Sequence, residues 1–542
     1  MSPYREPPEA PRRRWSVGLT ANGDLRFCAG GLCLFLAASI VAASGCVRKR
    51  SENLEPAFAA TGTETTALGL DVTALAASHP GLSGVHLLGN PRRAFATLVG
   101  LADAAERSLD LQYYIWHLDT AGWLLIDAIW RAAERGVRVR LLLDDFHTAG
   151  MDWVLAALDA HPEIEVRLFN PFPTRHLRLL DAVRDFVATN RRMHNKSFTA
   201  DNQVTVMGGR NIGDSYHGEG ATVTFADLDV AAVGPIVGEV SAQFYRFWNS
   251  PFAVPAAEII RPQAPPPDDY LATRTASRLA RAETVAYTDS LDPWLRAFPL
   301  EAMPLEWGRA VLIYDAPEKI ENGRSSTEDL MIPALLAAMG VPERRLDIVT
   351  PYFVISESWT DVFASWTARG VELRILTNSL AANDPAIAHA GYLVRRRSLL
   401  LGGVQLFELK ADARDPEIGD REAEAGRSSV SGSAATLHAK TAAIDGRRLF
   451  VGSLNLDQRS AYLNTEMGMV IESPPLAEAL HRMFDERLLD HAYRVTIGED
   501  SQLRWIERTP NGDVIHDSEP EMGVIGWLST GIVALLPLDW LL

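Results

Sequence analysis

Hydrophobic and polar residues follow two kinds of periodicity along this chain. From Ala94 to Ala105, apolar residues recur at i, i+4, i+7 and i+11, which is the spacing of one helix face. The run SLDLQYYIW at 108–116 is rich in apolar residues and predicts a buried strand. A helix is expected over 121–134, and RGVRVRLLLDD at 135–145 predicts a turn followed by another buried strand. The pattern therefore alternates helix and strand.

The same order returns in the second half of the chain. RLDIVTPYFV at 345–354 and RGVELRILTNS at 369–379 predict strands, with a helix expected near 359–368. EVRLFNP at 165–171 and GVQLFELK at 403–410 predict a further strand in each half. The string RGV recurs at an offset of 234 residues, and VRLF and VQLF are separated by 238. A fixed order with a drifting offset is what loop insertions produce in a duplicated domain.

Strands that alternate with helices favour a parallel or mixed sheet with helices on both faces. The sequence thus predicts an α/β fold of two similar halves, each a mixed β-sheet flanked by helices. Two copies of one domain would place equivalent loops opposite each other across a pseudo-two-fold axis.

The beginning of the chain has the pattern of an export signal. Residues 29–45 are apolar or small, and arginines precede them. The sequence then reads Ala43-Ser44-Gly45-Cys46, which resembles a bacterial lipoprotein signal box. Cleavage before Cys46 and acylation of its sulfur are expected; a plain signal anchor or an ordinary signal peptide is the alternative. Val47 stands where an inner-membrane retention Asp would, so a lipoprotein facing the periplasm is expected, with the outer membrane favoured over the inner.

The end of the chain is apolar as well. Residues 522–542 carry one charge, at Asp539, and Pro537 interrupts the run. Trp527 and Trp540 suit a membrane interface. Docking onto a membrane surface is the expected role, and a membrane span or a buried tail are the alternatives. The resulting segments are a lipoprotein signal peptide at 1–45, a polar tether at 46–75, a first domain at 76–255, a Pro-rich linker at 256–304, a second domain at 305–500 and a membrane-associating segment at 501–542.

The net charge argues against one class of partner, and the positions of the cysteines exclude one kind of fold stabilisation. The net charge of −17 argues against a nucleic acid as the main partner, because such binding depends on clustered Lys and Arg. The three cysteines, Cys28, Cys33 and Cys46, all lie near the N-terminus, which excludes a disulfide framework in the folded body.

Two copies of one polar motif stand out from this background. The first copy begins at His194 and reads HNKSFTADNQVTVMGGRN. The second begins 244 residues later, at His438, and reads HAKTAAIDGRRLFVGSLN. Lysine occurs only five times in the chain, against 47 arginines, yet both copies hold one. The positions shared by the copies are His194, Lys196, Asp201, Gly209 and Asn211 in the first, and His438, Lys440, Asp445, Ser453 and Asn455 in the second.

These residue types suit phosphoryl transfer without a metal or a cofactor. His and Lys two apart on a strand point to the same face. One imidazole can attack phosphorus while the other acts as general acid and then base. Lysines and asparagines would stabilise the charge on the phosphoryl oxygens. Asp201 and Asp445 are counted with the catalytic motif, although their main expected role is in the turn after the strand.

A reacting imidazole needs a partner for its second ring nitrogen. Carboxylates follow each motif, Asp227 and Asp229 in FADLDVAAVG and Glu466 in NTEMGMVI. Asp227 and Glu466 are predicted to orient the two histidines.

The paired motifs, with GGRN and GSLN after them, resemble the phospholipase D superfamily over roughly residues 75–495. The stretches QYYIW, RLFNP, LTNSLAAND and GSLNLDQRSAYLNTE are closer still to bacterial cardiolipin synthases, in particular the cardiolipin synthase C group. The resemblance implies a His nucleophile, usually that of the first motif and hence His194, and a phosphatidyl-enzyme intermediate. It also implies transfer to the hydroxyl of another phospholipid, such as phosphatidylglycerol, to make cardiolipin.

Alternatives remain open at this point. The same motifs serve phospholipid hydrolysis and, elsewhere in the superfamily, nucleic-acid cleavage; a lipid-binding protein without activity is the third possibility. Phospholipids and a membrane surface are the expected partners, no nucleic acid is expected, and a helper protein is possible. Among other residues, His147 is a candidate for the pocket mouth. Arg395, Arg396 and Arg397 are expected on a solvated helix face or, alternatively, at a headgroup phosphate. Tyr113 and Tyr114 are expected as buried strand residues.

Overall fold

The computed structural model describes residues 50–520 of the chain, with gaps. The gaps are residues 52–54, 179–180, 182–184, 186–188, 220–222, 261–266, 268, 297–299, 301–302, 323–329, 383–385 and 412–433. The expected signal peptide at 1–45, Cys46 and the apolar segment 522–542 lie outside the described residues. No helix among the described residues has the length and hydrophobicity needed to cross a membrane.

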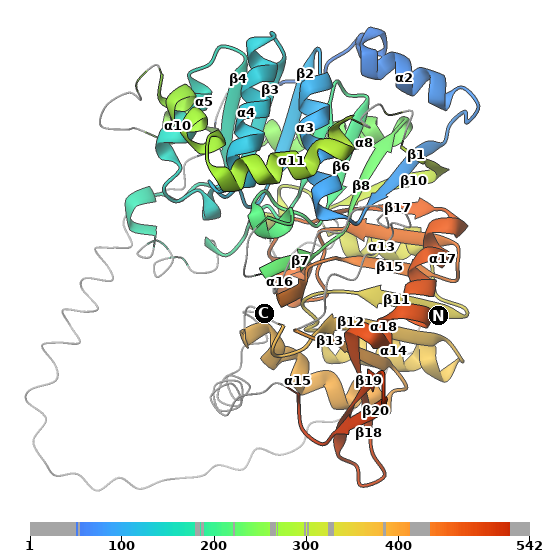
Figure 1. Cartoon of the computed structure of the whole chain (residues 1–542). Coiled ribbons are helices and arrows are strands. Elements are labelled where there is room, and N and C mark those ends of the chain that lie inside the picture. Colours follow the sequence, from blue (N-terminus) through green and yellow to red (C-terminus); the bar gives the residue numbers. More distant parts are fainter. Residues whose placement is uncertain are drawn as a thin grey trace, which may run out of the picture. The chain divides into compact units, whose positions relative to one another are not determined.

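The first half is a mixed sheet with helices on both faces (Figure 1). Its strands lie in the order β9-β4-β3-β2-β5-β6-β8-β1, with β2, β3 and β4 parallel and the other pairs antiparallel. The strands are β1 (Ser83–Leu88), β2 (Ser108–Tyr113), β3 (Arg138–Asp144), β4 (Ile164–Phe169), β5 (Ser197–Ala200), β6 (Val204–Gly208), β8 (Asp229–Val233) and β9 (Ala253–Pro255). The main helices are α3 (Pro91–Ala104), α4 (Thr120–Glu134), α5 (Asp152–Asp159) and α8 (Pro235–Trp248).

The second half repeats this topology. Its order is β20-β19-β18-β13-β12-β11-β15-β16-β17-β10, again with a parallel group, β11, β12 and β13, in the middle. The strands are β10 (Glu306–Tyr314), β11 (Arg345–Val349), β12 (Glu372–Asn378), β13 (Gln405–Leu409), β15 (Thr441–Ile444), β16 (Arg448–Gly452), β17 (Met467–Glu472), β18 (Ala492–Ile497), β19 (Leu503–Thr509) and β20 (Gly512–His516). The helices include α13 (Met331–Met339), α14 (Glu357–Ala368), α15 (Ala386–Leu401), α16 (Gln458–Tyr462) and α17 (Pro474–Arg482).

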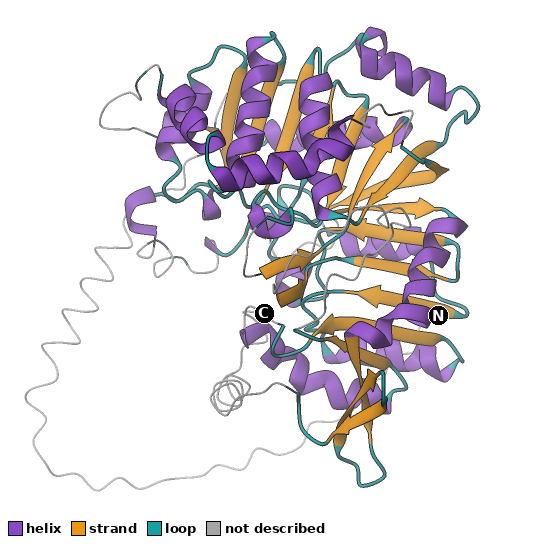
Figure 2. Cartoon of the chain, viewed as in Figure 1, coloured by secondary structure: helices purple, strands orange, loops and turns teal. Residues whose placement is uncertain are grey.

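The two sheets are continuous through their equivalent edge strands. β1 and β10 each lie beside the strand that follows the catalytic motif of their own half, β8 and β17, and they pair antiparallel with one another. Antiparallel pairing of equivalent strands is what a two-fold axis produces. The predicted α/β fold of two similar halves is therefore confirmed (Figure 2).

The expected segment boundaries need three corrections. The tether at 46–75 overlaps a 3₁₀ turn, η1 (Thr63–Thr65), and helix α2 (Ala67–Ala76). Leu68 and Val72, four residues apart on α2, are buried in the core of the first half. Their apolar stripe explains why this part of the segment folds as a helix.

The linker at 256–304 is structured as well. It forms α9 (Ala256–Ile259), α10 (Tyr270–Leu279) and α11 (Ala282–Arg296), and α11 lies across α3 (Figure 1). Tyr287 and Leu291, one helical turn apart, are buried in the core of the first half. The described parts of this stretch therefore form part of the helical layer that covers the first half.

The boundary at residue 501 is also wrong. β19 and β20 continue the second sheet beyond β18, so residues 503–516 belong to the folded second half.

The Arg395–Arg397 prediction is wrong for Arg396, which is buried between Glu408, at 3.0 Å, and Glu519, at 3.3 Å. Desolvation of this guanidinium is offset by two carboxylates.

Candidate active site

Each catalytic His segment lies against a segment of the other half. The His194 amide donates to the carbonyl of Thr465 at 2.9 Å, one residue before Glu466. The His438 amide donates to the carbonyl of Ala226 at 2.8 Å, one residue before Asp227. In the second pair the contact extends into a short parallel sheet of β7 (Val223–Ala226) and β14 (Ala434–Leu437). The two motifs therefore meet at a single site between the halves.

As a result, each catalytic histidine is paired with a carboxylate of the other half. His194 Nδ1 lies 2.8 Å from Glu466 Oε2, and His438 Nδ1 lies 2.5 Å from Asp227 Oδ2. The sequence named both carboxylates but not their partners, and the structure assigns each to the histidine of the opposite half. With Nδ1 engaged, Nε2 is the nitrogen left on each ring to react. Asp229, the other candidate, instead lies 3.2 Å from the Arg210 guanidinium.

Burial sets the protonation of the two imidazoles. Desolvation, with Lys440 next, lowers the pKa of His438 to about 4. Desolvation followed by the charges of Lys196 and Lys440 lowers the pKa of His194 well below its usual value. Without substrate both rings are therefore neutral near pH 7, the state in which an imidazole can act as a nucleophile or a base.

The two carboxylates differ electrostatically. Burial raises the pKa of Glu466 to about 7. Burial also works against ionisation of Asp227, but His438, Lys440 and Arg210 outweigh it and hold the pKa of Asp227 well below its usual range. The Asp227 carboxylate is therefore ionised throughout the physiological range, whereas Glu466 sits near its midpoint.

Both lysines are buried beside their histidines. Lys196 Nζ donates to the His194 carbonyl at 2.5 Å; Lys440 Nζ donates to the His438 carbonyl and lies 3.0 Å from His438 Nδ1. Desolvation lowers the pKa of Lys196 to about 7 and that of Lys440 to about 8. An anionic phosphoryl group would restore the charge balance that burial disturbs.

The small-residue position of each motif is matched to its carboxylate. A Cβ at Gly209 would lie 2.1 Å from Asp227 Oδ1, so only glycine leaves room for this side chain. At the equivalent position, the Ser453 hydroxyl donates to Glu466 Oε2 at 2.5 Å. The Gly/Ser difference between GGRN and GSLN therefore reflects the difference between Asp227 and Glu466.

The asparagines end their motifs in buried positions. Asn211 Oδ1 accepts a hydrogen bond from the Ile115 amide at 3.1 Å, which ties the end of the motif to the loop after β2. Asn455 is buried, and its carboxamide oxygen has no hydrogen-bond partner among the described residues. The Asn211 Nδ2 group has no hydrogen-bond partner among the described residues, so it is available as a donor.

Asp201 and Asp445 lie away from the reacting groups and stabilise the fold. Both adopt positive φ, 51° and 53°, in the turn between the two strands of their motif. The Asp201 carboxylate accepts hydrogen bonds from the amides of residues 106–108, and Asp445 accepts from those of residues 343–345. Each Asp thus joins its hairpin to the start of the neighbouring central strand, and the structure places neither in contact with a histidine.

Aromatic rings that the sequence did not identify flank both imidazoles. The Tyr114 ring lies 4.9 Å from His194 and also 4.9 Å from the ring of His147. Tyr216 and Phe225 lie 5.3 and 5.2 Å from His438. Tyr114 follows the last residue of β2, and its position at the end of a central parallel strand was the available signal. The interpretation of Tyr114 as a strand residue was therefore incomplete.

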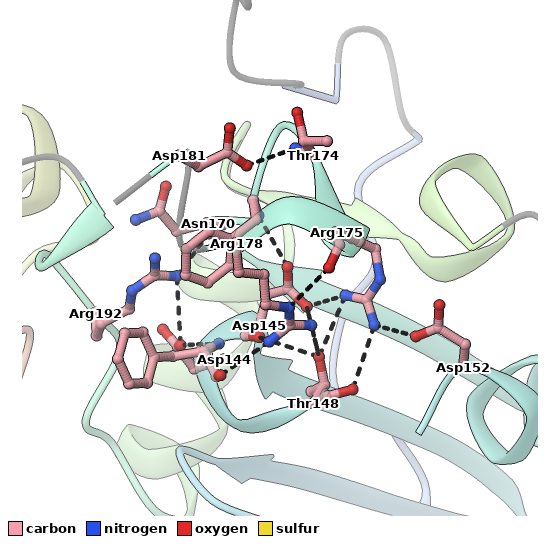
Figure 3. A network of polar contacts seen from close by, with 12 residues as sticks. Asp144, Asp145, Thr148, Asp152, Asn170, Thr174, Arg175, Arg178, Asp181 and Arg192 are labelled. Carbon is pink, nitrogen blue, oxygen red and sulfur yellow. Dashed lines mark hydrogen bonds and ion pairs between the residues drawn. The ribbon is translucent and has the colours of Figure 1, made fainter. Parts of the chain in front are cut away.

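A network of buried polar side chains contacts the segment that leads to His194 and includes Asp144, Asp145 and Arg192 (Figure 3). Asp144, at the end of β3, accepts a hydrogen bond from the Met193 amide at 2.8 Å and lies 3.6 Å from the Arg192 guanidinium. Its neighbour Asp145 is fully buried and binds two arginines, Arg175 and Arg178. The network fixes the backbone just before the catalytic histidine. Among the residues that the structure describes, no group of three or more His, Cys, Asp and Glu side chains is placed to hold a metal ion.

Comparisons with known proteins identify the family of the chain. The family model described as "Cardiolipin synthase, PLD-like domain" matches residues 98–248 and 335–488, which are the two halves. The chain is 42% identical over 476 residues to cardiolipin synthase C of Escherichia coli (strain K12), covering 87% of this chain and 98% of the relative. It is 24% identical over 424 residues to cardiolipin synthase A of Erwinia tasmaniensis, covering 75% of this chain and 70% of the relative.

A solved structure shows the same fold. The crystal structure of phosphatidylserine synthase from Haemophilus influenzae Rd KW20 matches 87% of this chain and 98% of its own, with a TM-score of 0.52 and 14% sequence identity. At that identity the likeness concerns the fold alone. The family match over both halves and the 42% identical relative carry the assignment. The chain belongs to the phospholipase D-like cardiolipin synthase family.

Proposed function

We propose that this protein is a phosphatidyltransferase that makes cardiolipin from two phospholipids through a phosphatidyl-histidine intermediate. The observation that carries the proposal is the pair of buried histidines, each held at Nδ1 by a carboxylate of the other half and each accompanied by a buried lysine. The 42% identical relative named cardiolipin synthase C supports the choice of product.

The reaction follows from these groups in two balanced steps. In the first, Nε2 of one histidine attacks the donor's phosphorus, and the bond from phosphorus to the departing alcohol breaks. The second histidine gives its proton to that alcohol. In the second step this histidine takes the proton from the hydroxyl of the acceptor lipid, whose oxygen attacks phosphorus as the phosphorus–nitrogen bond breaks. Lys196 and Lys440 stabilise the negative charge on the phosphoryl oxygens.

The electrostatic difference between the half-sites supports His194 as the nucleophile. A general acid must carry a proton before the first step, and an ionised carboxylate at Nδ1 stabilises the imidazolium. Asp227, the partner of His438, is the carboxylate whose pKa is lowered. The negative phosphodiester of the substrate further favours the imidazolium form of His438.

Lipid analysis tests the function directly. The full-length protein and the His194→Ala variant would be produced in a bacterium that lacks cardiolipin, and lipids would be quantified by mass spectrometry. Cardiolipin in the first strain and none in the second is expected. Phosphatidic acid without cardiolipin would mean that water resolves the intermediate and that the protein is a hydrolase.

The intermediate itself can be trapped. The His438→Ala variant keeps the nucleophile but lacks both the acid of the first step and the base of the second. With a phosphatidyl-4-nitrophenol donor, whose leaving group needs no acid, peptide mass spectrometry without acid treatment should find a phosphatidyl group on the peptide that contains His194. The same adduct on the His438 peptide of the His194→Ala variant would reverse the two roles.

We also propose that an acylated Cys46 attaches the protein to a membrane on the periplasmic side, the outer membrane being favoured. The sequence of the leader supports this placement. Cys46→Ala should move the protein from the membrane fraction toward the soluble fraction and abolish labelling by an alkyne fatty acid. Unchanged fractionation and labelling would contradict acylation at Cys46.

A further inference from the structure

An apolar slot opens beside the catalytic lysine of the second half. It lies between helices α13 and α14 and the sheet strands β11 and β15, and Lys440 and Asn455 line one end. Its volume is about 150 Å³. An enclosed apolar cavity of that size takes up a hydrocarbon as large as benzene, so the slot has room for part of a hydrocarbon chain. We call it the α13–α14 slot.

Both helices present one full apolar face to the slot. On α13, Ile332, Leu335, Leu336 and Met339 lie at i, i+3, i+4 and i+7. On α14, the lining residues are Trp359, Phe363 and Trp366, again at helical spacing, with neighbouring ring centroids 5.8 and 5.6 Å apart. Large apolar side chains thus face a space that the described residues leave open.

The floor of the slot leads directly to the chemistry. Lys440, Ala442 and Ile444 alternate along β15 and its entry, so their side chains point to one face of the sheet. The ammonium of Lys440 stands at one end of this row, beside His438. A group held at Lys440 therefore has an apolar channel behind it on the same face of the sheet.

In the first half, the cavity beside the equivalent lysine, Lys196, has a volume of only about 10 Å³. Phe198 on β5 pairs with Leu111 on β2, and Ala442 on β15 pairs with Ile348 on β11, so Phe198 and Ala442 are equivalent by register. The Phe198 ring is fully buried in the core of the first half. Replacing a phenyl ring by a methyl group at this point opens the second half.

The helices that cover these positions also differ, because those of the first half are more deeply buried than those of the second half. α4 buries nine of its residues and α11 covers α3, whereas α14 buries only Thr360 and Phe363. Leu336 of α13 remains 40% exposed at the rim. The second half is therefore less tightly packed than the first half next to the catalytic groups.

We propose that the α13–α14 slot binds a fatty acyl chain of the phospholipid whose phosphate is held at Lys440. A phospholipid joins an anionic phosphate and an apolar chain through a short glycerol unit, and the slot joins an ammonium and an apolar channel in the same way. The proposal rests on the proposed function for the identity of the phosphate, and it names the part of the protein that recognises the lipid's apolar portion.

Photolabelling tests the slot independently of turnover. The full-length His194→Ala/His438→Ala protein, which cannot react, would be mixed with micelles of a phosphatidylglycerol that carries a diazirine on one acyl chain. Irradiation and peptide mass spectrometry should place the label on the peptides of α13 and α14, around Leu335 and Trp366. Label confined to other parts of the chain, or no label, would overturn the proposal.

Two variants close the slot in different ways. Ala442→Phe introduces the ring that Phe198 supplies in the first half, and Leu336→Glu places a charge at the exposed rim without touching the core. Each should lower labelling of α13 and α14 about tenfold, because two or more methylene groups would then stay in water. Val362→Glu is the matched control: Val362 is 36% exposed on α14 and does not line the slot, so labelling should not change.

Activity provides the second readout. In the otherwise unaltered enzyme, Ala442→Phe and Leu336→Glu should slow turnover of long-chain phosphatidylglycerol by about tenfold but leave hydrolysis of the water-soluble bis(4-nitrophenyl) phosphate within about twofold. Equal loss on both substrates would overturn the acyl-chain role.

The outcomes separate this inference from the proposed function. Label in the slot of a protein that makes no cardiolipin would leave the slot assignment standing and overturn the function. Cardiolipin synthesis with no label in the slot would do the reverse. Labelling that occurs only after removal of residues 521–542 would mean that the chain's own apolar segment fills the slot, which would overturn the proposal.

Discussion

The two catalytic half-sites have the same backbone plan but differ in their chemistry. His194 faces Glu466, whose extra methylene brings it within reach of the Ser453 hydroxyl. His438 faces the shorter Asp227, which occupies the space above Gly209. Burial raises the pKa of Glu466 to about 7, while the surrounding positive charge lowers that of Asp227.

This difference shows how a duplicated domain can divide the work of one reaction. The shared elements, His and Lys in the segment that leads into a strand and Asp in the turn after that strand, hold the geometry that both halves need. The exchanged elements, one carbon in the carboxylate and one hydroxyl beside it, decide how readily each imidazole accepts a proton. A symmetric site would have to use two identical groups as nucleophile and as acid.

Removal of either histidine should have the largest effect and would test whether the half-sites form one site. His194→Ala and His438→Ala should each lower the rate of cardiolipin formation by about a thousandfold or more, because nucleophile and acid/base act as a unit. The double variant should be no slower than the single ones. Partial losses that multiply in the double variant, measured with purified protein and labelled phosphatidylglycerol, would show two independent sites.

Neutralising the two carboxylates should lower kcat by different amounts. Asp227→Asn removes an ionised partner from His438 and should reduce kcat about a hundredfold or more. Glu466→Gln removes a group that is only half ionised near pH 7, and the loss in kcat should be about tenfold. Circular dichroism would check folding of both variants. Equal losses would mean that the two carboxylates do the same work.

Exchange of the small residues tests how each half-site is matched to its carboxylate. Gly209→Ser would place Cβ against Asp227 Oδ1 and should cost about a hundredfold in kcat, since the carboxylate must leave His438. Ser453→Gly removes one hydrogen bond to Glu466 and should cost about tenfold or less. A Gly209→Ser enzyme with normal kcat would show that the Asp227 contact with His438 is dispensable.

The pH dependence of stability should be opposite for the two carboxylates. The raised pKa of Glu466 contributes stability that is fully present below about pH 4.5 and is lost as the pH rises through about 7. The free energy of unfolding of Glu466→Gln should therefore rise relative to that of the wild type between these pH values. The lowered pKa of Asp227 contributes stability that is present above its unfolded pKa of 3.8 and is lost as the pH falls. The advantage of wild type over Asp227→Asn should therefore shrink in acid. Urea unfolding of the three proteins at several pH values measures both effects, which should amount to a few kcal/mol at most. Parallel pH profiles for the two variants would contradict the electrostatic difference.

The two halves, the order of their elements and the residues of both motifs could all be predicted from the sequence. The repeat offset of 244 identified the equivalent residues of the two motifs. The predicted strand position of His194 and Lys196 was wrong, because β5 begins only at Ser197 and β15 only at Thr441. Asp201 followed from turn chemistry as well, because Asp tolerates the left-handed conformation that the turn requires. These features depend on neighbours along the chain, which a sequence shows directly.

The tertiary structure alone decided the partners. His194 and Glu466 are 272 residues apart, and His438 and Asp227 are 211 apart, so only the way the two sheets meet could cross the pairs between the halves. The α13–α14 slot also required three dimensions. Phe198 and Ala442 both fit an apolar strand pattern, and nothing local distinguishes a side chain that fills a core from one that leaves room for a ligand. The physical reason is that packing space is a property of several elements together, whereas hydrophobic periodicity records only which face of one element is buried.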